Sequence, residues 1–285
     1  MASKVDLHLH TTASDGIYTP SEITRRAAEK GLEYISITDH DTVNGVAEAQ
    51  AAARELNGLT VIPGVEISTD YANGLVHILG YFVDYNSLKF QQALKEMRLS
   101  RELRAQGMID KLAGLGIHID WPRVKRIAGE ASIGRPHIAQ AMLEKGYING
   151  IPEAFYKYIG QGGPAYVERI KTTPEEAARL ILDSGGLPVL AHPLTIDRPE
   201  AMIVKLKAIG LVGIEAYYGE FNQKQINLLV KLSKKHTLIA TGGSDYHGFG
   251  TEIETMLGDA DVPLEAVQRL VEHYQNQKAA NKELT

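Results

Sequence analysis

The sequence predicts an α/β fold built on a mostly parallel sheet or barrel, with a helical subdomain inserted into it. Seven short apolar runs rich in β-branched residues have the length of strands, and helical patterns separate most of them. The 285-residue chain is long enough for a barrel of about 250 residues with an insertion. More than one hundred residues of mainly helical pattern lie between the fourth and fifth runs.

The predicted strands and helices alternate along both flanks of the chain, as in a parallel α/β sheet. Thr19 and Thr173 each open a capping box followed by proline at the first helical position, which predicts a helix start at both places. The strands are predicted over residues 5–10, 34–38, 59–67, 75–83, 187–192, 212–218 and 238–244. Further helices are predicted over 44–57, 199–210, 222–236 and 263–278.

One short connection departs from this alternation. Only ten residues separate Glu66 from His77, which is too few for a crossover helix, and Asn73-Gly74 is a turn signal. We therefore expect a hairpin that brings His77 back to the rim near which Glu66 lies, close to the end of the third strand.

The long helical stretch is the second departure. We interpret residues 87–164 as a helical subdomain inserted into the barrel, which we expect to cover the substrate. The barrel is then discontinuous in sequence and consists of 1–86 and 165–285.

The composition excludes several classes of protein and site. The chain has no cysteine, so disulfides, thiolate catalysis and thiolate metal ligands are excluded, and a reducing cytoplasm fits. No apolar run reaches the length of a membrane span, and the first residues lack the apolar core of a signal peptide. The formal charge of −5 gives no basic footprint for nucleic acid, and no protein partner is indicated.

Histidines and acidic residues gather where the predicted strands end. His8 and His10 leave one face of the first strand, and Asp15 follows in a loop of small residues. Alone, each such residue could be a surface or capping group, but together they fall on the one rim where barrels build active sites. The other members of this set are His40, Glu66, His77, His192, Asp245 and His247.

Nine imidazole and carboxylate donors exceed the three protein ligands that a catalytic zinc ion uses. Without thiolates, manganese, zinc or iron is expected, and the number of donors suits two or three ions. Two ions about 3.5–4 Å apart can clamp a phosphate and activate a water, which is the arrangement used in phosphoryl transfer.

The motifs "DLHLHTTASDG", "TDHDT", "PGVEIS", "AHP" and "GSDYHG", with His77, resemble those of the polymerase and histidinol phosphatase (PHP) superfamily. The resemblance implies a distorted seven-stranded TIM-like barrel, the PHP fold, with metal ions at its C-terminal rim. It also implies three ligand groups: His8, His10, Glu66 and Asp245; Glu66, His77 and His192; and Asp15, His40 and His247. We expect Asp39 and Asp41 to orient His40 rather than to bind metal.

Two motifs of the helical insert, "GRPHIA" and "GGPAYV", resemble the branch of this superfamily that acts on nucleotides. The resemblance implies release of phosphate from 5′-nucleotides or 3′,5′-bisphosphonucleotides, or trimming of short RNA from its 5′ end. Arg135 would then clamp a phosphate, and His137 would contact the substrate or donate a proton to the leaving oxygen. Lys171 is a further candidate for substrate binding. The alternative for Arg135 is an arginine on the surface of a helix.

We therefore predict a metal-dependent phosphoesterase acting on small nucleotides or short RNA. Three alternatives stay open at this point. The first is a phosphatase for histidinol phosphate, and the second is a processive exonuclease or proofreading module. The third is a binding domain that metal ions stabilise but that catalyses nothing.

Overall fold

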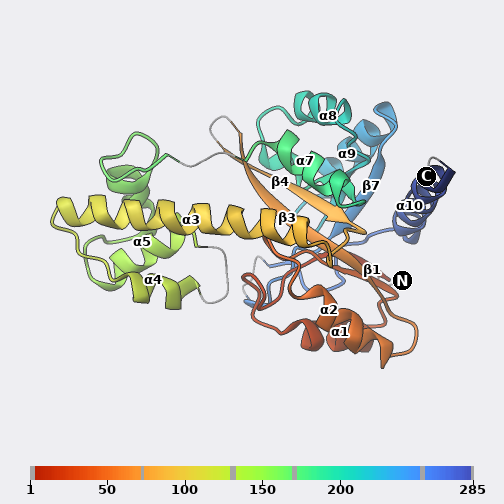
Figure 1. Cartoon of the computed structure of the whole chain (residues 1–285), viewed down its shortest axis with the longest axis horizontal. Helices are drawn as coiled ribbons and strands as arrows, with labels where there is room; N and C mark the ends of the chain where they lie inside the picture. Colours follow the sequence, from red (N-terminus) through yellow and green to blue (C-terminus); the bar gives the residue numbers. More distant parts are fainter. Residues whose placement is uncertain (1–3, 72–73, 129–132, 169–171, 251–253, 284–285) are drawn as a thin grey trace. The chain divides into compact units, whose positions relative to one another are not determined.

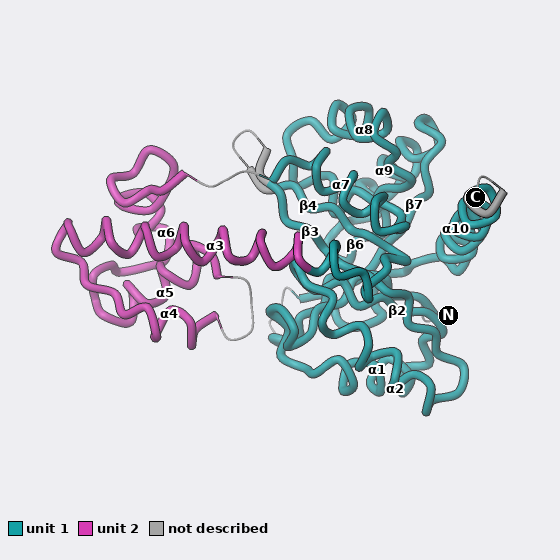
Figure 2. The backbone as a smooth tube through the Cα atoms, viewed as in Figure 1, with its two compact units in different colours: residues 1–91, 172–285 teal, residues 92–171 magenta. Residues whose placement is uncertain are grey.

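The structure is a computed structural model, which describes residues 4–71, 74–128, 133–168, 172–250 and 254–283 (Figure 1). The chain forms two compact units (Figure 2). The first consists of Met1–Gln91 and Thr172–Thr285, and the second consists of Gln92–Lys171.

The first unit is built on a seven-stranded sheet whose strands neighbour one another in chain order. Every neighbouring pair is parallel except the two that involve β4, which runs antiparallel to β3 and β5. The strands are β1 (Val5–Leu9), β2 (Tyr34–Ile37), β3 (Thr60–Tyr71), β4 (Gly74–Tyr81), β5 (Leu187–Leu190), β6 (Gly213–Tyr218) and β7 (Ile239–Gly243).

The two edges of the sheet meet just beyond β7. The Asp245 N–H donates to the His8 carbonyl at 2.9 Å, and the His10 N–H donates to the Tyr246 carbonyl at 3.0 Å. These bonds join the first strand to the last, so the sheet is a nearly closed barrel. The predicted α/β barrel of seven strands is confirmed.

Helices cover the barrel strands of the first unit. The capping boxes at Thr19 and Thr173 are present, and in each the threonine hydroxyl accepts from the backbone N–H three residues later, at 3.2 Å. The helices are α1 (Pro20–Glu29), α2 (Val46–Arg54), α7 (Pro174–Asp183), the 3₁₀ turn η2 (Pro193–Thr195), α8 (Pro199–Lys207), α9 (Gln223–Lys235) and α10 (Leu264–Glu283).

The predicted hairpin is confirmed by the antiparallel pairing of β3 with β4, in which Ser68 lies opposite His77. Asn73, in the predicted turn, lies outside the described residues. β3 continues to Tyr71, past the predicted end at residue 67, so Glu66 lies in the middle of its strand and not near the end. The reason is that β4 supplies hydrogen-bond partners for these additional residues.

β1 is buried on both of its faces, which positions the histidines of the site. Val5, Leu7 and Leu9 pack into apolar clusters beneath the covering helices. Because side chains alternate along a strand, Asp6 and His8 point to the opposite face, where both are fully buried. A strand with polar side chains buried in the barrel needs partners for them.

The second unit is helical and has an apolar core of its own. It contains most of α3 (Leu88–Gly114), then α4 (Trp121–Ala128), α5 (Arg135–Glu144), α6 (Ile151–Ala154) and the π-helical turn η1 (Phe155–Ile159). The predicted helical insert, 87–164, overlaps this unit, and its role in covering the substrate stays a prediction. Among the described helices, none has the length and apolar character needed to span a membrane.

Candidate metal centre

The structure brings all nine predicted ligand residues together in the first unit, where the parallel strands end. His8 lies on β1, Glu66 on β3 and His77 on β4. The loops that follow β1, β2, β5 and β7 carry the remaining members, which are His10, Asp15, His40, His192, Asp245 and His247.

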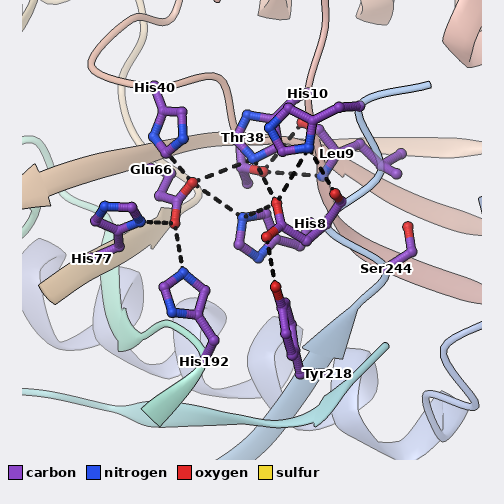
Figure 3. A network of polar contacts seen from close by, with 12 residues as sticks. His8, Leu9, His10, Thr38, His40, Glu66, His77, His192, Tyr218 and Ser244 are labelled. Carbon is purple, nitrogen blue, oxygen red and sulfur yellow. Dashed lines mark hydrogen bonds and ion pairs between the residues drawn. The ribbon is translucent and has the colours of Figure 1, made fainter. Parts of the chain in front are cut away.

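Glu66 is the centre of this cluster and is only 1% exposed (Figure 3). Five imidazole nitrogen atoms lie within 3.3 Å of its two carboxylate oxygens. His8 Nε2, His10 Nε2 and His40 Nδ1 face Oε2 at 3.2, 3.3 and 3.2 Å, while His77 Nδ1 and His192 Nε2 face Oε1 at 2.8 and 3.2 Å.

Four of the donors, His8, His10, Glu66 and Asp245, form one group whose ligand atoms lie close together. Their nitrogen-to-oxygen separations are 3.2 and 3.3 Å to Glu66 Oε2 and 3.3 and 3.0 Å to Asp245 Oδ1. For metal bonds of about 2.1 Å, ligand atoms lie about 3.0 Å apart in an octahedral site and about 3.4 Å apart in a tetrahedral site. The spacing therefore suits one divalent cation.

Several of these buried atoms have no hydrogen-bond partner among the described residues. They are Nε2 of His8, both ring nitrogens of His10, and Oδ1 of Asp245. Such atoms are costly to bury unless something satisfies them. A cation bound between them would do so, and the donor set therefore fits a metal ion.

Two further groups share members with the first. His40, Glu66 and His77 form one group, and His192 touches the same carboxylate. His10, Asp15, His40 and His247 form the other, with ring nitrogens 3.4–3.7 Å from the Asp15 carboxylate. His40 thus lies between Asp15 and Glu66, whereas the family resemblance implied that it belongs only to the group of Asp15 and His247.

Burial and charge act against each other in this cluster. Burial alone would raise the pKa of Glu66 and Asp245, but the neighbouring imidazoles, led by His40 for Glu66 and His8 for Asp245, hold both pKa values well below the usual range. Burial disfavours the charged form of His8 and His10, yet the surrounding carboxylates raise the pKa of both rings well above 6.5. For His40, burial dominates and lowers the pKa to about 4. The metal-free centre therefore holds protons on His8 and His10 that a divalent cation would displace.

Glu215 supports the cluster and was missed by the sequence analysis. Its side chain is fully buried on β6 and accepts from His8 Nδ1 at 2.9 Å and from the His192 N–H at 2.8 Å. This contact keeps a proton on His8 Nδ1, so Nε2 is the nitrogen that can bind a metal ion once the cation has displaced its proton. The available signal was a glutamate within the apolar run 212–218.

Tyr218 at the end of β6 holds Asp245. Its hydroxyl donates to Asp245 Oδ2 at 2.9 Å, which leaves Oδ1 facing the histidines. Burial, with the Asp245 charge next in size, raises the pKa of Tyr218, so the phenol keeps its proton. This role of Tyr218 was not predicted from the sequence.

Asp39 and Asp41 act on different parts of the centre. The Asp39 carboxylate accepts from the Thr11 N–H and hydroxyl and from the Ser14 hydroxyl, each at 2.7 Å, so it fixes the loop that carries Asp15 rather than the His40 ring. Asp41 accepts from the Ser68 N–H at 3.0 Å, and the Ser68 hydroxyl lies 3.2 Å from His40 Nδ1.

The backbone is strained at three points around the cluster. Asp41, His192 and Asp245 have φ values of 52°, 26° and 56°, which residues with a Cβ seldom adopt. Each such residue costs about 1–3 kcal/mol and persists where its surroundings fix it. Here the strain aims a ring and a carboxylate into the cluster.

The predicted substrate residues lie in the second unit. Arg135 is the first residue of α5, and its guanidinium carbon lies 5.4 Å from the centre of the Phe155 ring. His137 is two residues further, and its Nδ1 accepts from the Gly134 N–H at 3.0 Å. Lys171 lies outside the described residues.

Comparison with known proteins connects this geometry to a family. Residues 6–183 match the PHP domain. The 5′-3′ exoribonuclease of Haemophilus influenzae is 34% identical over 87% of this chain and 91% of its own. The 3′,5′-nucleoside bisphosphate phosphatase of Chromobacterium violaceum is 33% identical over 87% and 88%. A structure from Bifidobacterium adolescentis, described as a metal-dependent phosphoesterase, superposes with a TM-score of 0.78 over 95% of this chain and 96% of its own, at 28% identity.

Proposed function

The chain belongs to the PHP domain family of metal-dependent phosphoesterases, and on that premise we propose that it hydrolyses phosphate esters of small nucleotides. The observation that carries this proposal is the group of His8, His10, Glu66 and Asp245, with its cation-like spacing and its buried donor atoms that make no hydrogen bond. Of the two relatives compared above, one is a 5′-3′ exoribonuclease and the other is a phosphatase for 3′,5′-nucleoside bisphosphates.

We propose that the cluster holds two or three divalent ions, of manganese, zinc or iron. The first group would hold one ion, Glu66 with His77 and His192 a second, and Asp15 with His40 and His247 a third. When bound, such ions neutralise the phosphate oxygens and lower the pKa of water, which makes a nucleophile available at neutral pH.

The chain's own residues prepare this site by fixing protons and orientations. Glu215 holds the His8 tautomer, and Tyr218 holds the rotamer of Asp245. The depressed pKa values of Glu66 and Asp245 keep both carboxylates ionised near neutral pH. Donors that are already oriented need no reorganisation when the phosphate arrives.

On the substrate side, we propose that Arg135 clamps a phosphate through its planar fork. The Phe155 ring beneath the guanidinium restricts its orientation. In neutral His137, the bond accepted by Nδ1 leaves the proton on Nε2, so this ring can donate to a substrate oxygen. Lys171 stays a candidate for an additional phosphate contact.

We propose nucleoside 5′-monophosphates, 3′,5′-bisphosphonucleotides and the 5′ ends of short RNA as the substrates. A net charge of −5 disfavours tracking along a long nucleic acid, which a processive nuclease needs.

A substrate panel with added Mn²⁺ tests this proposal. It compares a nucleoside 5′-monophosphate, a 3′,5′-bisphosphate, a short RNA, histidinol phosphate and an aryl phosphate, each with and without a chelator. We expect release of phosphate or nucleotide from the first three, lost with chelator and lost in Glu66→Gln. A preference for histidinol phosphate would contradict the substrate class, and turnover that survives full metal removal would contradict the metal dependence.

A further inference from the structure

Two large apolar side chains are exposed beside the metal cluster. Phe249 is 59% exposed and Ile17 is 50% exposed, and both lie next to His247 in structure. Exposed phenyl and butyl groups at the mouth of a polar site are unfavourable in water, and they often mark a surface that contacts a ligand. This pair has no part in holding the ions.

Phe249 extends a column of aromatic rings that begins at the buried donors. The His10 and His247 rings stack at 4.1 Å with an interplanar angle of 11°, and the His247 and Phe249 rings stack at 5.5 Å with an angle of 17°. Along this column the residues pass from 1% exposed at His10 to 59% exposed at Phe249. The Phe249 ring is therefore nearly parallel to the ring of His247, a candidate metal ligand, and it is exposed to solvent.

The backbone on either side of Phe249 is hydrogen-bonded to Glu254. The Glu254 carboxylate accepts from the backbone N–H groups of His247, Gly248 and Gly250, at 2.9, 2.6 and 2.7 Å. The Ile17 N–H donates to the His247 carbonyl at 2.9 Å, which joins this loop to the one that follows Asp15. A fixed aromatic ring loses little entropy when a planar partner stacks on it.

We infer that Phe249 is the stacking surface for the base of the nucleotide substrate, with Ile17 as its apolar border. This inference rests on the proposed function, and it adds a residue that determines specificity for a base over a bare sugar phosphate. Aromatic rings bind any base through its flat face, so the surface discriminates weakly among the four bases.

The test compares a nucleoside 5′-monophosphate with ribose 5-phosphate, the same ester without a base. Steady-state kinetics with Mn²⁺ are measured for wild type, Phe249→Ala, Phe249→Trp and Leu228→Ala. Leu228 is a control of similar exposure, 49%, on α9. The readout is the ratio of kcat/KM for the nucleotide to that for the sugar phosphate.

Stacking of one base on an aromatic side chain corresponds to about 5- to 150-fold in affinity. We expect Phe249→Ala to lower the ratio by about 5- to 20-fold through KM, Phe249→Trp to restore it, and Leu228→Ala to leave it unchanged. An unchanged ratio in Phe249→Ala overturns the inference while nucleotide hydrolysis by wild type still supports the proposed function. Wild type that hydrolyses neither ester overturns both. Sedimentation analysis of the same variants tests whether a second copy of the chain covers Phe249 instead. If wild type is a dimer, Phe249→Ala is a monomer and the ratio is unchanged, the ring belongs to a subunit interface.

Discussion

The substitution Glu215→Gln removes the negative charge of the carboxylate that contacts His8 and His192, while the volume of the side chain is kept. The carboxylate accepts two hydrogen bonds in a fully buried position, one from the His8 ring and one from the His192 N–H. A glutamine places an oxygen at one of these positions and an NH₂ group at the other, so only one donor keeps its acceptor.

Either orientation of the amide weakens the metal site. If the NH₂ group faces His8, the ring accepts at Nδ1 and carries its proton on Nε2, where the metal should bind. If it faces His192, two donors oppose each other at a residue whose φ is already 26°. Losing a hydrogen bond to a charged acceptor costs about 1.5–3 kcal/mol, or about 10- to 150-fold in affinity, and loss of such a supporting carboxylate typically costs about 10- to 100-fold.

Calorimetric titration of chelator-treated protein with Mn²⁺ measures this change directly. Glu272→Gln, an exposed position on α10, serves as the control for loss of one carboxylate. We expect about 10- to 100-fold weaker binding in Glu215→Gln, recovery of most activity at high Mn²⁺, and no change in the control. Unchanged affinity in Glu215→Gln would refute the idea that this carboxylate sets the His8 tautomer.

Four further predictions follow from the same geometry. Because the pKa values of His8 and His10 lie above 6.5 in the metal-free protein, metal binding at neutral pH should release protons, and the affinity for metal should fall as the pH decreases. Calorimetry in buffers of different ionisation enthalpy measures the number of protons released. Those protons stabilise the metal-free fold fully below pH 6.5, and urea unfolding of chelator-treated protein should show this contribution being lost as the pH rises through the raised values. Glu66→Gln should lower turnover by orders of magnitude, since Glu66 belongs to two of the three groups of donors, while circular dichroism still shows a folded barrel; near-native turnover at equal metal content would disprove the central place of Glu66. Gly248→Ala should destabilise the fold by about 1–3 kcal/mol in thermal unfolding, because φ is 89° and a Cβ would lie 2.7 Å from Ile17 Cγ1, whereas Gly58→Ala has a similar φ of 86° with open space and should cost less.

The sequence predicted most of the barrel because its local signals agree with the tertiary structure. The short apolar runs rich in β-branched residues predict strands, the two capping boxes predict helix starts, and the short connection after Glu66 predicts a hairpin, and these predictions agree with one another. The length of β3 was not predictable in this way, because its last residues are ordered by pairing with β4 and not by their own pattern.

The candidate site was also predictable from the sequence only in part. The nine metal-ligand candidates could be predicted because histidines and acidic residues seldom recur at successive strand ends unless they bind a ligand. The supporting roles of Glu215, Tyr218 and Asp39 depend on contacts between strands and loops that are far apart in sequence, such as the 207 residues between His8 and Glu215. A single sequence contains no signal for which buried carboxylate meets which ring.

The closure of the barrel between β1 and β7 has a consequence for how the protein opens. His8 and His10 lie on one side of this seam and Asp245 on the other, so an ion bound to all three would fasten the first strand to the segment after the last. In a chain without disulfides, occupancy then sets the frequency of local opening, because binding stabilises only the closed state. Amide exchange at His10 and Asp245 would report loading of the enzyme more directly than its global melting temperature.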